Sequence, residues 1–138
     1  MTSLIWDDKF NTGVAALDAQ HRKIFDYMTH IYSDLIDNSH KCDSINGMLD
    51  QLEILCQLNL FNEDQLMDET NYPLSAEHKH QHDLFLATLD QLKIDNNQCH
   101  SPNIISKFTN IIENYISHML TGNMLLSEFI KNNSGNAT

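Results

Sequence analysis

The sequence predicts an all-α protein: an up-down-up-down antiparallel four-helix bundle that follows an extended N-terminal arm. The main observation is the spacing of apolar residues, which recur every three or four positions through four long segments. Polar connections that contain helix-capping or helix-ending residues separate these segments. Short connections favour antiparallel neighbours, and a bundle buries four apolar stripes at once. No segment has the alternating pattern of a strand.

The length of 138 residues predicts one domain that is large enough to bury a substantial core. We divide it into an arm over residues 1–17, a bundle over residues 18–131, and a polar segment over residues 132–138 that is a tail or the start of a linker.

Composition and charge limit the classes of binding partner and the cellular location that we expect for this protein. A net charge of -11 disfavours nucleic acid and anionic membranes as partners. No apolar run is long enough to span a bilayer, and the N-terminus lacks a basic segment followed by an apolar one. Cys42, Cys56 and Cys99 are odd in number and widely separated, so we expect reduced thiols. These features together predict a cytoplasmic protein.

The arm and the first helix differ in pattern. The arm lacks helical periodicity, and we expect Trp6 and Phe10 to pack on the domain. From Leu17 an apolar stripe with one histidine begins, and Asn38-Ser39-His40 are expected to end this helix. The members of the stripe are Leu17, His21, Ile24, Phe25, Met28, Ile31, Tyr32 and Leu35.

The second helix is expected to start with Asp43 or Ser44 as its cap and to end before Asn71. Its apolar face includes Asn59 and Glu63, one helical turn apart. Buried polar groups need partners, so this pair requires an explanation.

The third helix is expected to run from an N-cap at Ser75 to about Ile94. His78 and His82 are four residues apart, which places both imidazoles on the inner face, whereas His80 points away.

For the fourth helix, Ser101-Pro102 provide a start, and the apolar stripe continues to Phe129. This stripe contains Tyr115 and His118.

Every predicted helix therefore contributes a metal-binding side chain to the interior. A lone core histidine is usually a hydrogen-bonded core residue, but five such residues on four stripes indicate a metal site. Imidazole and carboxylate suit iron, manganese or zinc, and a carboxylate can bridge two ions. The five residues are His21, Glu63, His78, His82 and His118.

These residues resemble the hemerythrin family, specifically its bacterial members. The resemblance covers nearly the whole chain: Trp6, Phe10, Gly13 and the segment 17–21 at the start, Glu63 with the segments 66–67 and 72–73, then the segment 78–83, and finally His118. It implies a non-heme di-iron centre with an oxo or hydroxo bridge, which binds dioxygen at one iron.

Two family ligand positions differ in this chain. The resemblance places a histidine where Asn59 stands and a bridging aspartate where Asn123 stands. It implies that His78, His82, His118 and Glu63 serve one iron, and that the other iron keeps His21 and its share of Glu63. Either two irons still bind, with water at the vacated positions, or the protein is mononuclear. We favour two irons, because buried Glu63 and His21 need a compensating ion.

Tyr115 lies one turn before His118 and either borders the ligand position with Asn59 and Asn123 or is a core aromatic residue; the second role is favoured.

The functional hypothesis is a domain that binds or senses dioxygen, another small diatomic ligand or an anion, or that reads redox state through iron. Open metal positions suit a sensor better than a reversible carrier, and residues 132–138 fit a connection to a signalling output domain. Two alternatives stay open: a mononuclear or degenerate protein for oxygen or iron storage, and a di-iron enzyme that reduces peroxide or nitric oxide.

Overall fold

The structure is a computed structural model that describes residues 6–37, 42–96 and 103–136, with side chains in the last range described as far as Asn133. Within these residues the chain forms one 3-10 helix and five α-helices. The elements are η1 (Asp8–Phe10), α1 (Ala15–Ile36), α2 (Cys42–Thr70), α3 (Ser75–Asn96), α4 (Ile104–Leu120) and α5 (Gly122–Asn136).

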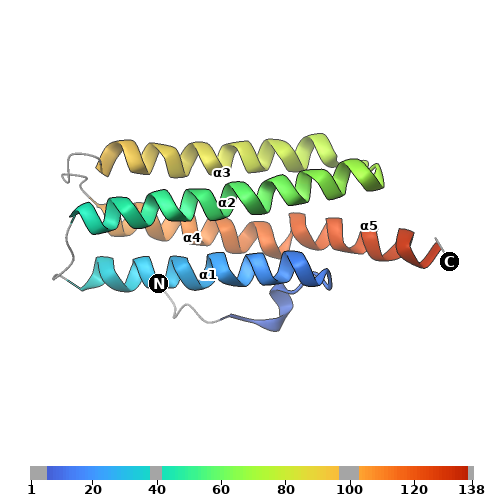
Figure 1. Ribbon diagram of the computed structural model, residues 1–138, viewed down its shortest axis with the longest axis horizontal. Coiled ribbons are helices and arrows are strands. Elements are labelled where there is room, and N and C mark those ends of the chain that lie inside the picture. Colours follow the sequence, from blue (N-terminus) through green and yellow to red (C-terminus); the bar gives the residue numbers. More distant parts are fainter. Residues whose placement is uncertain (1–5, 38–41, 97–102, 137–138) are drawn as a thin grey trace.

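The α-helices form a bundle of four parallel columns, in which α5 continues the column of α4 (Figure 1). Successive columns run in opposite directions. Helix α1 contacts α2 and α4, and α3 contacts the same two helices. The predicted all-α four-helix bundle is confirmed.

The inner faces of the helices carry the apolar stripes and form two clusters. The larger cluster includes Ile31, Leu52, Leu89 and Phe108, each with no exposed surface. Burying a side chain of this kind stabilises the fold by about 1.5–3 kcal/mol. The smaller cluster centres on Met67, Tyr72 and Leu126, nearer the other end of α2. Along α2, the polar inner positions lie between these two clusters.

The described part of the N-terminal arm, from Trp6 onward, contacts the bundle. The ring of Trp6 meets Phe10 and Phe25 edge-on, with centroid distances of 5.3 Å and 5.6 Å. The Asp18 carboxylate accepts hydrogen bonds from the backbone and hydroxyl of Thr12, at 2.6 Å and 2.7 Å. These contacts fix the arm against the start of α1, which begins at Ala15, inside the segment predicted to be extended.

Several helix ends differ from the prediction. Asp43 and Ser44 lie within α2, which starts at Cys42. Ser75 is the first residue of α3 rather than its cap, and α3 continues to Asn96. The expected ends at 38–40 and 101–102 lie outside the described residues.

The predicted single fourth helix is interrupted at Thr121. This residue has φ -117° and ψ -76°, and its backbone N–H donates to Ser117 before α5 starts at Gly122. A Cβ at Gly122 would lie 3.1 Å from Gln81 Oε1 and 3.2 Å from ring atoms of His118. The break thus brings the chain close to a site histidine at a position where only glycine fits without displacing a neighbour. Helix α5 reaches Asn136, so residues 132–136 of the predicted tail are helical.

The expectation of reduced thiols holds for one described cysteine and fails for the other. Cys56 is a free, buried thiol, whereas Cys42 is disulfide-bonded. Sequence spacing did not indicate this bond. Cys99 lies outside the described residues.

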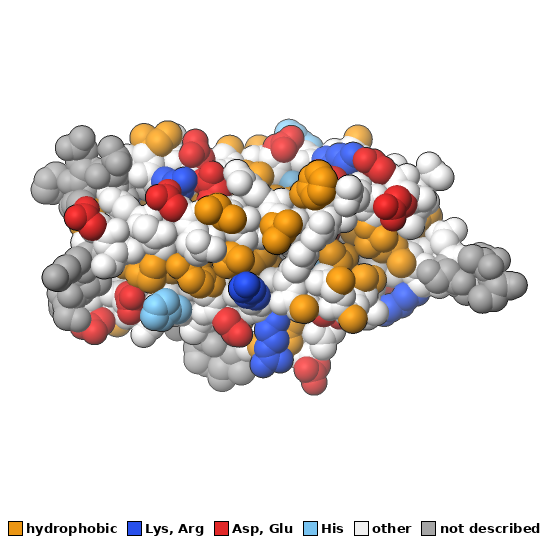
Figure 2. Space-filling view, viewed as in Figure 1, with side chains coloured by type: hydrophobic (Ala, Val, Ile, Leu, Met, Phe, Trp, Pro, Cys, Tyr) orange, Lys and Arg blue, Asp and Glu red, His pale blue; other side chains and the backbone are white. Residues whose placement is uncertain are grey.

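The visible surface is mixed in character. On the face in Figure 2, acidic side chains are spread along the length of the molecule among apolar and uncharged ones. None of the helices in the described ranges is both long enough and apolar enough to cross a membrane.

Candidate metal centre

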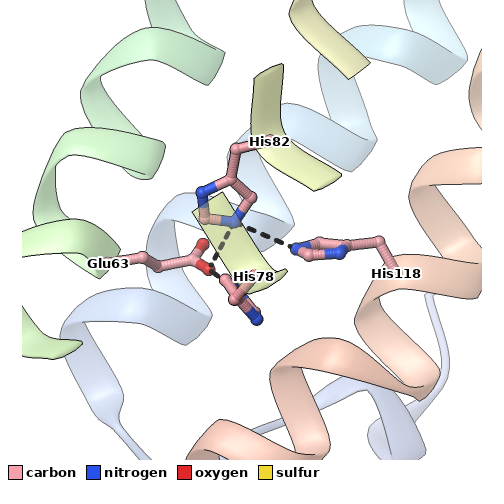
Figure 3. A group of neighbouring side chains, drawn as sticks. All are labelled: Glu63, His78, His82 and His118. Atoms are coloured by element: carbon pink, nitrogen blue, oxygen red, sulfur yellow. Dashed lines mark hydrogen bonds and ion pairs between the residues drawn. The ribbon is translucent and has the colours of Figure 1, made fainter. Parts of the chain in front are cut away.

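Four side chains from three helices converge in the interior of the bundle: Glu63 from α2, His78 and His82 from α3, and His118 from α4 (Figure 3). Their potential ligand atoms all lie within 4.8 Å of one another. His78 Nε2 lies 3.0 Å from Glu63 Oε1, and His82 Nε2 lies 3.2 Å from His118 Nε2. We call these four residues the histidine-glutamate cluster.

Helical spacing explains the convergence. His78 and His82 are one turn apart on α3, and their ring centroids are 4.4 Å apart. Glu63 lies on the inner stripe of α2 and has no exposed surface. Both α3 histidines are 3% exposed, while His118 is partly exposed. The cluster is thus a polar group that is almost completely buried from solvent inside an apolar bundle.

His21 approaches the glutamate from the opposite side. Its Nε2 lies 3.0 Å from Glu63 Oε2, whereas His78 and His82 face Oε1 at 3.0 Å and 3.3 Å. Both carboxylate oxygens therefore have imidazole partners. His21 is not a member of the four-residue group whose ligand atoms lie within 4.8 Å. Its Nδ1 is buried and has no hydrogen-bond partner.

Charge states at the cluster favour cation binding. Burial raises the pKa of the Glu63 carboxyl, but hydrogen bonds with His21, His78 and His82 outweigh burial and hold the pKa well below its usual range. Burial lowers the pKa of His118 to about 3. A carboxylate and a neutral imidazole are the forms that bind metal ions.

The two asparagines at the substituted positions behave differently. The Asn59 amide donates a hydrogen bond of 3.0 Å to Gln20 Oε1, toward α1. The Asn123 amide lies 3.3 Å from His21 Nε2, and its own Oδ1 is buried without a partner. Asn123 therefore borders the His21 side of Glu63, while the amide nitrogen of Asn59 faces Gln20.

Tyr115 is 4% exposed, and its hydroxyl has no hydrogen-bond partner. Its ring centroid lies 6.5 Å from that of His21. Burial, with smaller effects from Cys56 and Glu63, raises its pKa well above the usual range, so the phenol is neutral.

Sequence reasoning missed two polar neighbours, Gln20 and Asp64. Asp64 Oδ1 lies 3.4 Å from His82 Nδ1, which is ion-pair distance, although neither atom makes a hydrogen bond. A carboxylate behind a metal-binding histidine fixes the orientation of the ring. Apolar periodicity could not identify Gln20 or Asp64, because each adjoins an inner-face residue and points about 100° away from it around the helix.

Comparison with known proteins agrees with this geometry. The family profile described as "Hemerythrin HHE cation binding domain" matches residues 12–129. The bacteriohemerythrin of Stenotrophomonas maltophilia (strain R551-3) is 27% identical over 94 residues, which are 68% of this chain and 60% of that protein. Hemerythrin subunit 1 of Golfingia vulgaris is 32% identical over 93 residues, 67% of this chain and 74% of that protein. The hemerythrin of Phascolopsis gouldii is 30% identical over 91 residues, 66% of this chain and 72% of that protein.

Fold, cluster and profile define a four-helix cation-binding domain. The chain belongs to the hemerythrin family. The match spans 60% of the length of the bacteriohemerythrins of Stenotrophomonas maltophilia and Pseudomonas aeruginosa.

Proposed function

We propose that this chain is an iron-binding domain in which the histidine-glutamate cluster holds the first ion. The observation that carries this proposal is the convergence of three imidazoles and one ionised carboxylate within 4.8 Å in a buried site. The nitrogen and oxygen donors suit ferrous and ferric iron. The hemerythrin relatives support iron rather than zinc or manganese.

A second, weaker iron belongs on the other side of Glu63. His21 Nε2 and Glu63 Oε2 would hold it, and Asn123 is the nearest remaining donor. The unpartnered Oδ1 of Asn123 supports this assignment, because a buried carbonyl oxygen without a partner is costly and a cation would satisfy it. The Asn59 amide N–H donates to Gln20 Oε1, so Oδ1 is the atom of that side chain that could bind an ion.

Bound iron would supply a redox-active centre that binds dioxygen, another small diatomic ligand or an anion. The protein's own residues set the character of that centre. Glu63 offers one negative charge for two cations, and amides replace an imidazole and a carboxylate of the family pattern. A second ion with so few protein ligands exchanges its remaining partners readily, which suits sensing of dioxygen or redox state more than reversible carriage.

We place this sensing role in a larger bacterial signalling protein with a separate or covalently linked output domain. A cytoplasmic location is part of the same proposal. The disulfide at Cys42 weighs against that location, because such bonds are rare in reducing compartments, and cell fractionation decides the point.

The test is iron content per chain after anaerobic purification, followed by the visible absorption spectrum on mixing the ferrous protein with oxygen. We expect more than one iron per chain at saturating iron and an oxygen-dependent absorption band. Saturation at one iron would favour the mononuclear storage alternative. The absence of His21 from the four-residue group supports that alternative. Steady-state turnover of peroxide or nitric oxide would favour the enzymatic alternative.

A further inference from the structure

The outward face of α2 carries an apolar row that the described part of the chain leaves uncovered. Ile54, Leu58 and Phe61 are 57%, 54% and 58% exposed, although each side chain is large and apolar. They follow one another at intervals of four and three residues, so they share one face of the helix. Figure 2 shows apolar side chains gathered along α2 on the visible face. A contiguous exposed row of this kind marks a contact surface, whereas single exposed apolar residues do not.

This row is the centre of a longer seam. From Gly47 to Gln65 the interval alternates between four and three residues, and all six members are exposed. The alternation averages 3.5 residues, which is the repeat at which two helices pack side by side in a coiled coil. The buried residues of α2, such as Cys56 and Glu63, lie on the opposite side of the helix. We call this row the α2 seam, and its members are Gly47, Gln51, Ile54, Leu58, Phe61 and Gln65.

The polar character of the α2 seam favours a second copy of the same chain as its occupant. The net charge of -11 opposes self-association wherever acidic side chains would meet, but none of the six seam members is charged. Gln51 and Gln65 stand on either side of the apolar centre. A glutamine amide both donates and accepts, so each can hydrogen-bond to the same residue of a second copy. A seam that meets itself in register therefore matches its own polar positions.

The charges beside the seam determine the orientation of the two copies. On the α1 flank, Gln20 accepts a hydrogen bond from α2, and exposed Lys23 lies about one turn further along the same side. On the α3 flank, Lys93 pairs with Asp50 at 2.9 Å, and exposed Asp90 lies one turn before Lys93. A two-fold axis along parallel seams brings the α1 flank of each copy to the α3 flank of the other, so lysine meets aspartate. Antiparallel seams would bring the two acidic α3 flanks together, which is unfavourable.

The α2 seam is long enough for a specific but weak dimer. Residues 47–65 span about 27 Å along the helix axis. With one row of each flank, a strip of that length covers about 500 Å² on each copy. A standard interface covers about 800 Å² per partner, roughly a tenth of the 7870 Å² surface of this chain. We therefore expect a dissociation constant in the micromolar range.

We propose that two copies of this chain associate through the α2 seam, with their α2 helices parallel and in register about a two-fold axis. Each seam residue then packs against the same residue of the second copy, as an isologous interface requires. The inference goes beyond the proposed function. It does not involve iron, so an absent dimer would leave the metal centre unaffected, and an absent metal would leave the dimer unaffected.

Sedimentation velocity of the purified protein tests the association. We expect the average mass to rise from that of a monomer of 15.9 kDa toward twice that value as the concentration rises from about 1 to about 500 μM. Leu58→Glu places like charges on the two-fold axis and should weaken the dimer at least about tenfold. Leu84→Glu is the matched control, because Leu84 is 56% exposed on α3 outside the seam, and it should dimerise as the wild type does.

A wild type that stays monomeric at about 500 μM would overturn the proposal and leave a different protein as the occupant of the seam. Equal weakening by the two glutamate substitutions would overturn it as well, because the seam would then have no special role. Thermal melting checks that the variants fold, and Ile54→Glu replaces Leu58→Glu if the latter does not.

Cysteine crosslinking tests the orientation. Parallel seams bring Gln65 of one copy to Gln65 of the other, so Gln65→Cys should form a disulfide-linked dimer on mild oxidation. The wild type treated in the same way gives the baseline for the native cysteines. Antiparallel seams would instead bring Gly47 to Gln65. A mixture of Gly47→Cys and Gln65→Cys chains that links mainly between the two variants would overturn the parallel arrangement.

Discussion

The side-chain amide of Asn59 donates a hydrogen bond of 3.0 Å to Gln20, on the neighbouring helix α1. Asn59 stands one turn before Glu63, where the family pattern has a histidine, and an amide replaces the imidazole there. The side of Glu63 that faces His21 is consequently short of protein ligands, while the side that faces His78 and His82 keeps the whole histidine-glutamate cluster. The proposed iron centre therefore predicts unequal affinity of the two sides for iron.

Removal of single ligands should reveal the inequality. His78→Ala or His118→Ala should abolish most iron binding, because each removes a donor from the four-residue cluster. His21→Ala should remove mainly the second ion, because His21 contacts Glu63 Oε2, whereas His78 and His82 contact Oε1. Iron per chain, measured after anaerobic loading, distinguishes these outcomes. Equal losses in the three variants would contradict the division into two sides.

Removal of iron should destabilise the bundle. An ion that binds only the folded state adds RT ln(1 + [L]/Kd) to the free energy of unfolding, about 4 kcal/mol when free iron is a thousand times the dissociation constant. Three helices share the cluster, so stripping the ion should lower the melting temperature clearly. Calorimetric scans before and after chelation test this, and an unchanged midpoint would exclude a buried ion shared by the helices.

The metal-free protein should lose stability in mild acid. The pKa of His118 is about 3 in the folded state and about 6.5 when unfolded, so the unfolded chain binds more protons between these values. The contribution of His118 to the free energy of unfolding is complete above pH 6.5 and is smaller by about 2 kcal/mol at pH 5. The lowered pKa of Glu63 adds a further loss of stability below the ordinary glutamate pKa of 4.5. Urea unfolding at pH 7 and pH 5 measures the effect, and His118→Gln should show a smaller drop. The same drop in the variant would assign it to other groups.

The glycine at the start of α5 should matter for the site. A Cβ at Gly122 would lie 3.2 Å from His118 ring atoms, so Gly122→Ala should displace that imidazole and weaken the first iron. Gly47→Ala is the matched control, because a Cβ there meets nothing within 4 Å on α2. The control should bind iron normally and gain up to about 1 kcal/mol of stability. Normal iron affinity in Gly122→Ala would show that the ring tolerates the added methyl group.

The bundle and the inward placement of the five candidate ligands could be predicted from the sequence, because both follow from helical periodicity. His78 and His82 share a face by spacing alone, and Glu63 stands out as an acid on an apolar stripe. The break at Thr121 was not predictable, since the apolar pattern continues through it to Phe129. The bond between Asn59 and Gln20 and the disulfide at Cys42 depend on tertiary neighbours, which local patterns do not specify.

The most direct test of the unequal centre is iron stoichiometry across a titration, compared between the wild type and the double variant Asn59→His with Asn123→Asp. The histidine restores a neutral donor and the aspartate restores a negative bridge beside His21, so both changes strengthen the weaker side. We predict that the wild type binds one iron tightly and a second only at higher free iron, whereas the double variant binds two irons with similar affinity. A wild type that already takes up two irons in a single tight step would contradict the account, because the two asparagines would then not limit the second site.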